Sequence, residues 1–495
     1  MVKILMLQGK RLLSQNSNTI GYFSLAKDTF VYLVGSALSG LASFILLPIY
    51  TRSLTPSDFG VYALLDVTIL VIVTVAQVGL SVSYLKWFAD EGVSRRSELL
   101  GTVLIGGAIV AVVGGGLLTL VVVSPLGEQL LQTTERKFAW TLLPIVVLEN
   151  LQTLLINDLR ARRRTMAFST YAFVRLLAVT GFGWWLIVVQ DQGIFGLFLG
   201  RLAGAGVSFL LLIVLSLPIK MQPDWSTFFP MLRYGWPLVW SSLVAMLLDA
   251  SGRYFLSHYT TLEQVGFYSV SIKIASIFQV LLQQPFNTAW GGLMFQIVKM
   301  PNARLIYSKI LLYLFTLSMI AALVLALFTP ILFAVFATVA YIPVMAVLPV
   351  IFLVRAISIM EYPAAIGIYL RGRTQWFAAI YSVGLVVNVF ANYLLVPTYE
   401  VFGAAWAWFV AWLTITILMA CLGQYYYPLD YEWKWFLIPI MGWLVLLMGQ
   451  QWFAFVTDGT FWLLRMVLAV IVTFSVIGLI GRDFWLVASK LGERR

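Results

Sequence analysis

The chain has 495 residues, of which 61% are hydrophobic and only 11% are charged, and its mean hydropathy is +0.93. Soluble domains are roughly 45–50% apolar and about 25% charged, so these values exclude a soluble enzyme and a disordered chain. The net charge of +11 would suggest nucleic acid in a soluble protein. In a membrane protein it more often reflects basic cytoplasmic loops, and we therefore predict an all-α polytopic membrane protein with no nucleic-acid partner.

Fourteen stretches of the chain are long and apolar enough to cross a bilayer, which takes about 20 residues of helix. A cytoplasmic tail is predicted at 1–27 before the first of them, and another at 483–495 after the last. The predicted spans are 29–50, 60–84, 99–123, 139–157, 166–189, 193–218, 234–257, 265–288, 306–329, 342–368, 375–396, 402–424, 435–454 and 461–481.

The distribution of Lys and Arg predicts the orientation of these spans. With the N-terminus inside, 23 of the 32 basic residues fall in cytoplasmic segments. The outer loops hold only Arg52, Arg136 and Lys137. This bias predicts a multi-pass inner-membrane protein with both termini in the cytoplasm. Six cations remain inside spans: Arg175, Arg201, Arg253, Lys273, Arg355 and Arg465.

Pieces of the first half of the chain recur 206 to 211 residues later. Thr55 and Asp58 have the spacing of a helix capping box, and so do Thr261 and Gln264. Any short hairpin between two spans needs such a cap, so the caps alone do not indicate a repeat. The evidence for the repeat comes from further matches. These are Gly60 with Gly266, Tyr62 with Tyr268, Phe195-Gly196 with Phe402-Gly403, and the basic turns 159–162 and 370–373.

The repeat predicts two six-helix lobes that cross the membrane in the same sense. Spans 1–6 form an N-lobe at 28–220, spans 7–12 form a C-lobe at 221–433, and spans 13 and 14 follow at 434–482. Parallel repeats of this kind are typical of transporters in which a central site is exposed alternately to the two sides.

Three stretches carry a family resemblance: residues 47–62 (LPIYTRSLTPSDFGVY), Arg253–Leu256 followed by Gly266–Tyr268, and 388–397 running into Phe402–Ala405. They resemble the polysaccharide transporters, the Wzx-type oligosaccharide flippases, which are related to lipid II flippases and MATE exporters of the MOP superfamily. Gly252 stands where many relatives carry an acid, beside Arg253.

The resemblance implies a flippase that moves an undecaprenyl-diphosphate-linked oligosaccharide from the inner to the outer leaflet of the bacterial inner membrane. Such a flippase works by alternating access and serves the synthesis of lipopolysaccharide or exopolysaccharide. Spans 1, 2, 7 and 8 would form the cavity walls. The resemblance also implies coupling to H⁺ or Na⁺ gradients or to downstream polymerisation, and as partners a polysaccharide polymerase and a chain-length regulator.

Charges inside the spans are candidate site residues, because a charge in lipid costs at least about 2.5–3.5 kcal/mol and therefore faces protein or water. A diphosphate headgroup needs cations. Lys273 and Arg253 are the strongest candidates, followed by Arg52, Arg355, Arg201 and Arg175. The acids Asp66, Asp249, Glu149 and Glu361 are candidates for ion coupling. The competing interpretation is structural pairing, for example between Asp249 and Arg253, which share a helix face.

Two other classes remain as alternatives. A MATE-like, cation-coupled exporter of small molecules would require an acidic cavity, whereas cations outnumber acids in these spans. A membrane polymerase or ligase would require catalytic residues in a large outer loop, and the longest such loop is 125–138. We expect no enzyme activity, cofactor or metal, because one histidine (His258) and one cysteine (Cys421) build neither a triad nor a metal site.

Overall fold

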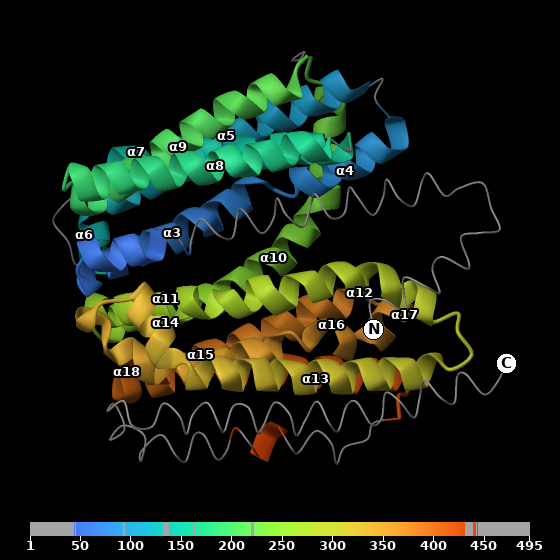
Figure 1. Ribbon diagram of the computed structural model, residues 1–495. Helices are drawn as coiled ribbons and strands as arrows, with labels where there is room; N and C mark the ends of the chain where they lie inside the picture. Colours follow the sequence, from blue (N-terminus) through green and yellow to red (C-terminus); the bar gives the residue numbers. More distant parts are fainter. Residues whose placement is uncertain are drawn as a thin grey trace. The chain divides into compact units, whose positions relative to one another are not determined.

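The computed structural model describes residues 44, 46–92, 95–131, 138–162, 164–218, 222–430, 439–441 and 443. The predicted span 461–481, most of 435–454 and of 29–50, both tails, and Arg136, Lys137 and Arg465 lie outside these residues. Within them, all regular structure is helical, which confirms the predicted all-α membrane class (Figure 1).

Nine described segments are long and apolar enough to span a membrane, and the count of fourteen remains a prediction. The predicted span 234–257 falls on one further helix, α10 (Trp225–Tyr259). The predicted spans 375–396 and 402–424 fall on the two halves of α18 (Gln375–Tyr426). This element is broken at Glu400, whose φ of 49° and ψ of −124° are not helical.

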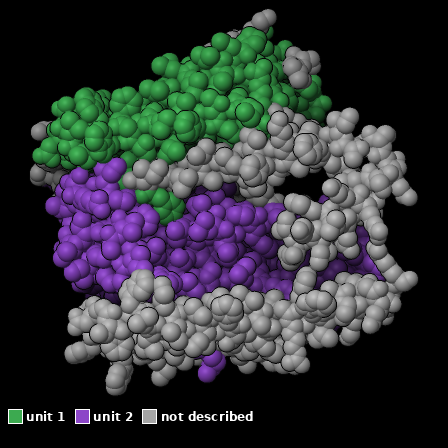
Figure 2. Space-filling view, viewed as in Figure 1, with its two compact units in different colours: residues 1–46, 72–125, 135–239 green, residues 47–71, 126–134, 240–495 purple. Residues whose placement is uncertain are grey.

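The described chain divides into two compact units (Figure 2). Unit 1 contains residues up to 46, 72–125 and 135–239, and unit 2 contains 47–71, 126–134 and 240 onward. Two helices, α3 (Pro56–Ala76) and α10, contribute one part to each unit. The division into lobes at 28–220 and 221–433 remains a prediction.

Unit 1 is built around four helices that run side by side (Figure 1). These are α5 (Arg96–Val123), α7 (Ala139–Ala161), α8 (Thr165–Trp184), which continues into a π-turn at Trp185–Val189, and α9 (Gly193–Ser216). The shorter α4 (Leu80–Glu91) packs against α5 and α7. Buried leucines and Tyr84 fill the space between them.

Unit 2 packs α11 (Leu262–Phe278) and α13 (Ala303–Leu327) against α15 (Pro343–Ser358), which in turn packs on α18. The remaining elements are α12 (Gln284–Ile297), α14 (Thr329–Phe336) and the short turns α16 (Glu361–Ala364) and α17 (Ile366–Leu370). The helix α6 (Pro125–Leu131) follows α5 in the chain. The predicted span 342–368 is therefore helical but interrupted between α15 and α17.

Both predicted helix caps are confirmed in unit 2. The amide of Asp58 donates to the Thr55 hydroxyl (3.2 Å), and the Thr55 amide donates back to the Asp58 carboxylate (3.3 Å). The Thr261 hydroxyl accepts from the amide of Gln264 (3.4 Å). These bonds satisfy amides that have no partner in the first turn of a helix, and so they fix where α3 and α11 begin.

The starts of α3 and α11 cross at a pair of glycines. A Cβ built on Gly60 would lie 2.0 Å from the carbonyl oxygen of Leu262, and one built on Gly266 would lie 2.0 Å from that of Pro56. Each glycine thus faces the first residue of the opposite helix, and the contact is reciprocal. Only residues without a side chain allow two helix backbones to approach this closely.

Candidate functional site

Lys273 and Asp66 meet in unit 2, on α11 and α3. The Lys273 Nζ lies 3.9 Å from the Asp66 Oδ2 and over two rings, 5.1 Å from the centre of Tyr62 and 5.9 Å from that of Phe59. Both charges lie about 15 Å along their helices, counted at 1.5 Å per residue from the helix starts. The side chains remain 19% and 32% exposed, so the ammonium is held by a carboxylate and by aromatic faces without being fully buried.

A third helix, α10, joins α3 and α11 near this pair. The hydroxyls of Thr68 and Tyr254 lie 2.8 Å apart and link α3 to α10. The Arg253 Nε donates to the Ser269 hydroxyl (3.1 Å) and links α10 to α11. These three helices correspond to the predicted spans 2, 7 and 8, which the resemblance placed around the substrate.

Arg253 itself is buried, with 8% of its surface exposed. Its Nη1 donates to the backbone carbonyl of Asp249 (3.2 Å), one turn earlier, and not to the carboxylate. The simple side-chain pair that the four-residue spacing suggested is therefore replaced by a bond to the backbone. In this arrangement Arg253 joins two helices.

A buried charge cluster surrounds Trp408 on α18. The Asp249 carboxylate accepts from the indole nitrogen of Trp408 (3.1 Å), and the guanidinium of Arg355 lies over the same ring, 4.8 Å from its centre. Arg355 is only 7% exposed, and its Nε has no hydrogen-bond partner among the described residues. One indole therefore contacts a half-buried carboxylate from α10 at its ring nitrogen and a buried guanidinium from α15 at its face.

Glu361 is bonded across helices as well. It is 6% exposed and accepts a hydrogen bond from the hydroxyl of Tyr381 on α18. Arg355 and Glu361 thus each contact α18. Both side chains lie in the interior of unit 2. They belong to the predicted span 342–368, which is not one of the four helices that the resemblance placed around the cavity.

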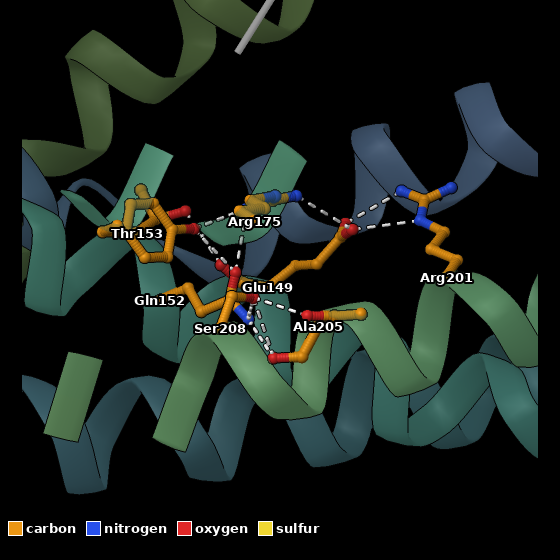
Figure 3. A network of polar contacts seen from close by, with 9 residues as sticks. Glu149, Gln152, Thr153, Arg175, Arg201, Ala205 and Ser208 are labelled. Carbon is orange, nitrogen blue, oxygen red and sulfur yellow. Dashed lines mark hydrogen bonds and ion pairs between the residues drawn. The ribbon is translucent and has the colours of Figure 1, made fainter. Parts of the chain in front are cut away.

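Glu149, Arg175 and Arg201 form one network within unit 1 (Figure 3). Arg201 on α9 holds the Glu149 carboxylate with two bonds of 3.0 and 2.9 Å, and Arg175 on α8 reaches it at 3.5 Å. Arg175 also donates to the side-chain oxygen of Gln152 (2.8 Å). The network ties α7, α8 and α9 together, and the forked Arg–carboxylate geometry is the strong form of this interaction. It favours a structural role for these three charges.

The sequence analysis missed a second ionic centre in unit 1, at Asp158. This carboxylate is fully buried and accepts from Arg96 through two bonds of 2.8 Å, from the Tyr84 hydroxyl (2.7 Å), and from Arg162 (2.7 Å). The two arginines had been counted as orientation signals only. The four-residue spacing of Asp158 and Arg162 at the end of a span was the available signal.

Arg52 lies exposed just before α3, and the structure joins it to no other candidate. No group of three or more His, Cys, Asp or Glu side chains within the described ranges could hold a metal ion. The structure therefore brings together Lys273 with Asp66, Asp249 with Arg355 around Trp408, and Glu149 with Arg175 and Arg201, but does not join these three groups into one site.

Known proteins with a similar fold are membrane flippases and exporters. A lipid II flippase, MurJ, in an inward closed conformation aligns with a TM-score of 0.74 and 13% identity, over 93% of this chain and 99% of its own. An inward-facing multidrug resistance MATE transporter of the MOP superfamily aligns with a TM-score of 0.64 and 14% identity, over 80% and 97%. A MOP superfamily transporter from Pyrococcus furiosus aligns at 0.54 and 12%, over 80% and 94%.

No curated protein sequence matches the chain. A family model described as "Polysaccharide biosynthesis protein" matches residues 25–298, more than half of the chain. This match starts just before the first predicted span, 29–50. It includes the crossing of α3 with α11, the Lys273–Asp66 pair and the whole of unit 1's four-helix bundle. The chain therefore belongs to the polysaccharide biosynthesis protein family and has the fold of the MOP superfamily flippases and transporters.

Proposed function

We propose that the chain is a flippase that moves an undecaprenyl-diphosphate-linked oligosaccharide from the inner to the outer leaflet of a bacterial inner membrane. The family to which it belongs supports a role in polysaccharide synthesis. The likeness to a lipid II flippase over nearly the whole of both chains supports the flippase mechanism. The observation that carries the proposal is the Lys273–Asp66 pair, in which an ammonium on α11 that is 19% exposed lies 3.9 Å from a carboxylate on α3.

In this mechanism the diphosphate of the substrate replaces Asp66 as the partner of Lys273. A lysine ammonium binds phosphate as a compact charge with three donors. When the phosphate takes Lys273, Asp66 loses its counter-charge, and the binding of H⁺ or Na⁺ to its carboxylate then becomes favourable. The exchange couples substrate to cation, because the bound cation restores the counter-charge that Asp66 loses.

Alternating access requires helices that bend. The helices that carry Asp66 and Lys273, α3 and α11, are each followed by an interruption. After α3 the backbone turns left-handed at Val78 (φ 46°) and Gly79 (φ 75°) before α4 begins. After α11 the helix widens into a π-turn at Gln279–Gln283 before α12. Interruptions at corresponding positions of a repeat are typical of the helices that line transporter sites. We propose that these two interruptions are the hinges.

The test is complementation of a strain that lacks the protein. Loss of the flippase should leave the lipid-linked oligosaccharide on the inner leaflet, where it is extracted and quantified, and should stop surface polysaccharide export. We expect Lys273→Ala to behave like the deletion, while Lys273→Arg retains partial export because the cation is kept. Lys299→Ala, an exposed lysine after α12, is the matched control and should export normally.

Two results would count against this function. If Lys273→Ala and Arg253→Ala both sustain normal export at normal protein level, the cationic site is wrong. If deletion leaves no lipid-linked glycan on the inner leaflet but makes cells sensitive to cationic drugs, the chain is a MATE-like exporter instead.

A further inference from the structure

An open apolar cleft lies in unit 1 over α7, between α5 and α9. Its volume is about 470 Å³, within the range of small-molecule sites of roughly 300–1,000 Å³. Its lining residues include Ile105 and Ala108 from α5, Leu151 from α7, and Phe209 and Ile213 from α9, and every lining residue is apolar. A cleft with no polar lining side chain can recognise a hydrocarbon chain but neither a sugar nor a headgroup.

One end of the cleft lies at Leu217, directly after α9. From Phe209 to Leu217 the helix rises about 12 Å, which is close to one leaflet of a hydrocarbon core about 30 Å thick. The cleft therefore has the depth of a single acyl chain that enters from the Leu217 end.

Arginines gather at this end. Arg96 donates to the carbonyls of Ser216 (2.7 Å) and Pro218 (2.8 Å), on either side of Leu217. Arg162 reaches the Ser216 carbonyl (3.5 Å), and Arg164 reaches that of Leu215 (3.1 Å). These bonds cap the C-terminus of α9, where unpaired carbonyls attract cations.

These capping bonds do not neutralise the positive charge of the arginines. Asp158 neutralises one of the two guanidiniums that it binds, those of Arg96 and Arg162. Exposed Arg164 contacts a backbone carbonyl, and exposed Arg160 lies over the ring of Phe168, 5.2 Å from its centre. Three other described acids of this end, Glu91, Glu98 and Asp224, converge on Arg95, while Asp90 lies exposed at the end of α4.

We propose that this cleft binds one acyl chain of an anionic phospholipid, with the phosphate at Arg164. The apolar lining selects the chain, and the surplus of arginine at a single end selects the negative headgroup. Basic pockets between helices at the membrane surface bind anionic lipids in this way. The site is separate from the Lys273–Asp66 pair, and the inference does not depend on the transported substrate.

Native mass spectrometry of the full-length protein tests the proposal, with phosphatidylglycerol and phosphatidylcholine of identical chains added in equal amounts. We expect one preferentially retained phosphatidylglycerol. Arg164→Gln should reduce the preference by roughly a factor of five. The same change at the exposed Arg373 of unit 2 is the matched control and should leave the preference unchanged.

A second pair of variants tests the cleft itself. Ile213→Trp fills it and should remove the retained lipid, whereas Val214→Trp, at the neighbouring residue that is 63% exposed and outside the lining, should not. If Ile213→Trp lowers the melting temperature, Ala108→Phe fills the cleft from α5. Equal retention of the two lipids, or full retention by a folded variant with a filled cleft, would overturn the proposal.

Discussion

The glycine crossing of α3 and α11 allows a stability prediction with a worked magnitude. Replacing Gly266 by Ala puts a Cβ 2.0 Å from the Pro56 carbonyl oxygen, whereas ordinary contact begins near 3.4 Å. The two helices must therefore separate by about 1.4 Å at this point. Overpacking of this size costs about 1–3 kcal/mol. Gly60→Ala should cost a similar amount, because the contact with Leu262 has the same geometry.

The reciprocal geometry also predicts that the two changes are not additive. A separation that accommodates the Cβ at Gly60 accommodates most of the Cβ at Gly266, since both clashes lie in one crossing. The double variant should therefore cost little more than either single one, and the interaction energy should be about −1 to −3 kcal/mol. Additive losses would mean that the two clashes are relieved separately.

Thermal melting of the purified protein in detergent measures these effects, with an expected loss of about 2–6 °C for each single variant. Gly116→Ala on α5 is the matched control. A Cβ there meets no atom within 4 Å, so Ala should be neutral or stabilising by up to about 1 kcal/mol. The reasoning is refuted if Gly60→Ala and Gly266→Ala melt with the control.

Three further predictions concern the ionic groups. Asp158→Asn should lower the free energy of unfolding by about 3–5 kcal/mol, because it leaves two buried guanidiniums with too little counter-charge. In the same melting assay Glu98→Gln should cost under about 1 kcal/mol, because the Glu98 side chain is 42% exposed in its pair with Arg95. Glu149→Gln should fall between these two, since the side chain of Arg175 is 36% exposed and stays solvated; a cost equal to that of Asp158→Asn would contradict this ranking. Bonds from Ser226 and a contact with Arg95 lower the pKa of Asp224, so its stabilising effect is present above its unfolded pKa and is lost as the pH falls through the lower folded value. Ser226→Ala should reduce the acid dependence of melting below about pH 4, and an unchanged profile would count against these bonds.

The class of the protein and most of its helices could be predicted from the sequence, because hydrophobic runs in a membrane have one dominant solution. The predicted spans from 60–84 through 402–424 coincide with described helices. The interruptions were harder to predict. The π-turn at Gln279–Gln283 and the break between α15 and α17 occur inside stretches whose hydropathy predicts continuous spans, and no glycine or proline marks the π-turn itself.

The partners of buried charges could be predicted only in part. Spacing within one helix suggested an ion pair between Asp249 and Arg253. Arg253 instead donates to the backbone carbonyl of Asp249 and to a serine on another helix. Glu149 with Arg201, and Asp158 with Arg96, join residues that are 52 and 62 positions apart. Contacts of this range depend on how helices are rotated about their axes, which hydropathy does not record.

The repeat, however, contained more information about the site than its matched residues suggest. Pro56 faces Gly266 and Leu262 faces Gly60, so positions about 206 residues apart face each other across the crossing of α3 and α11. The same offset places residue 272 opposite Asp66, one position from Lys273. Two identical residues at such positions would repel or merely pack, whereas an acid on one helix and a base on the other attract each other. In the proposed mechanism this departure from the repeat is what allows charge to be exchanged at the pair, and the roles of Lys273 and Asp66 have to be tested together.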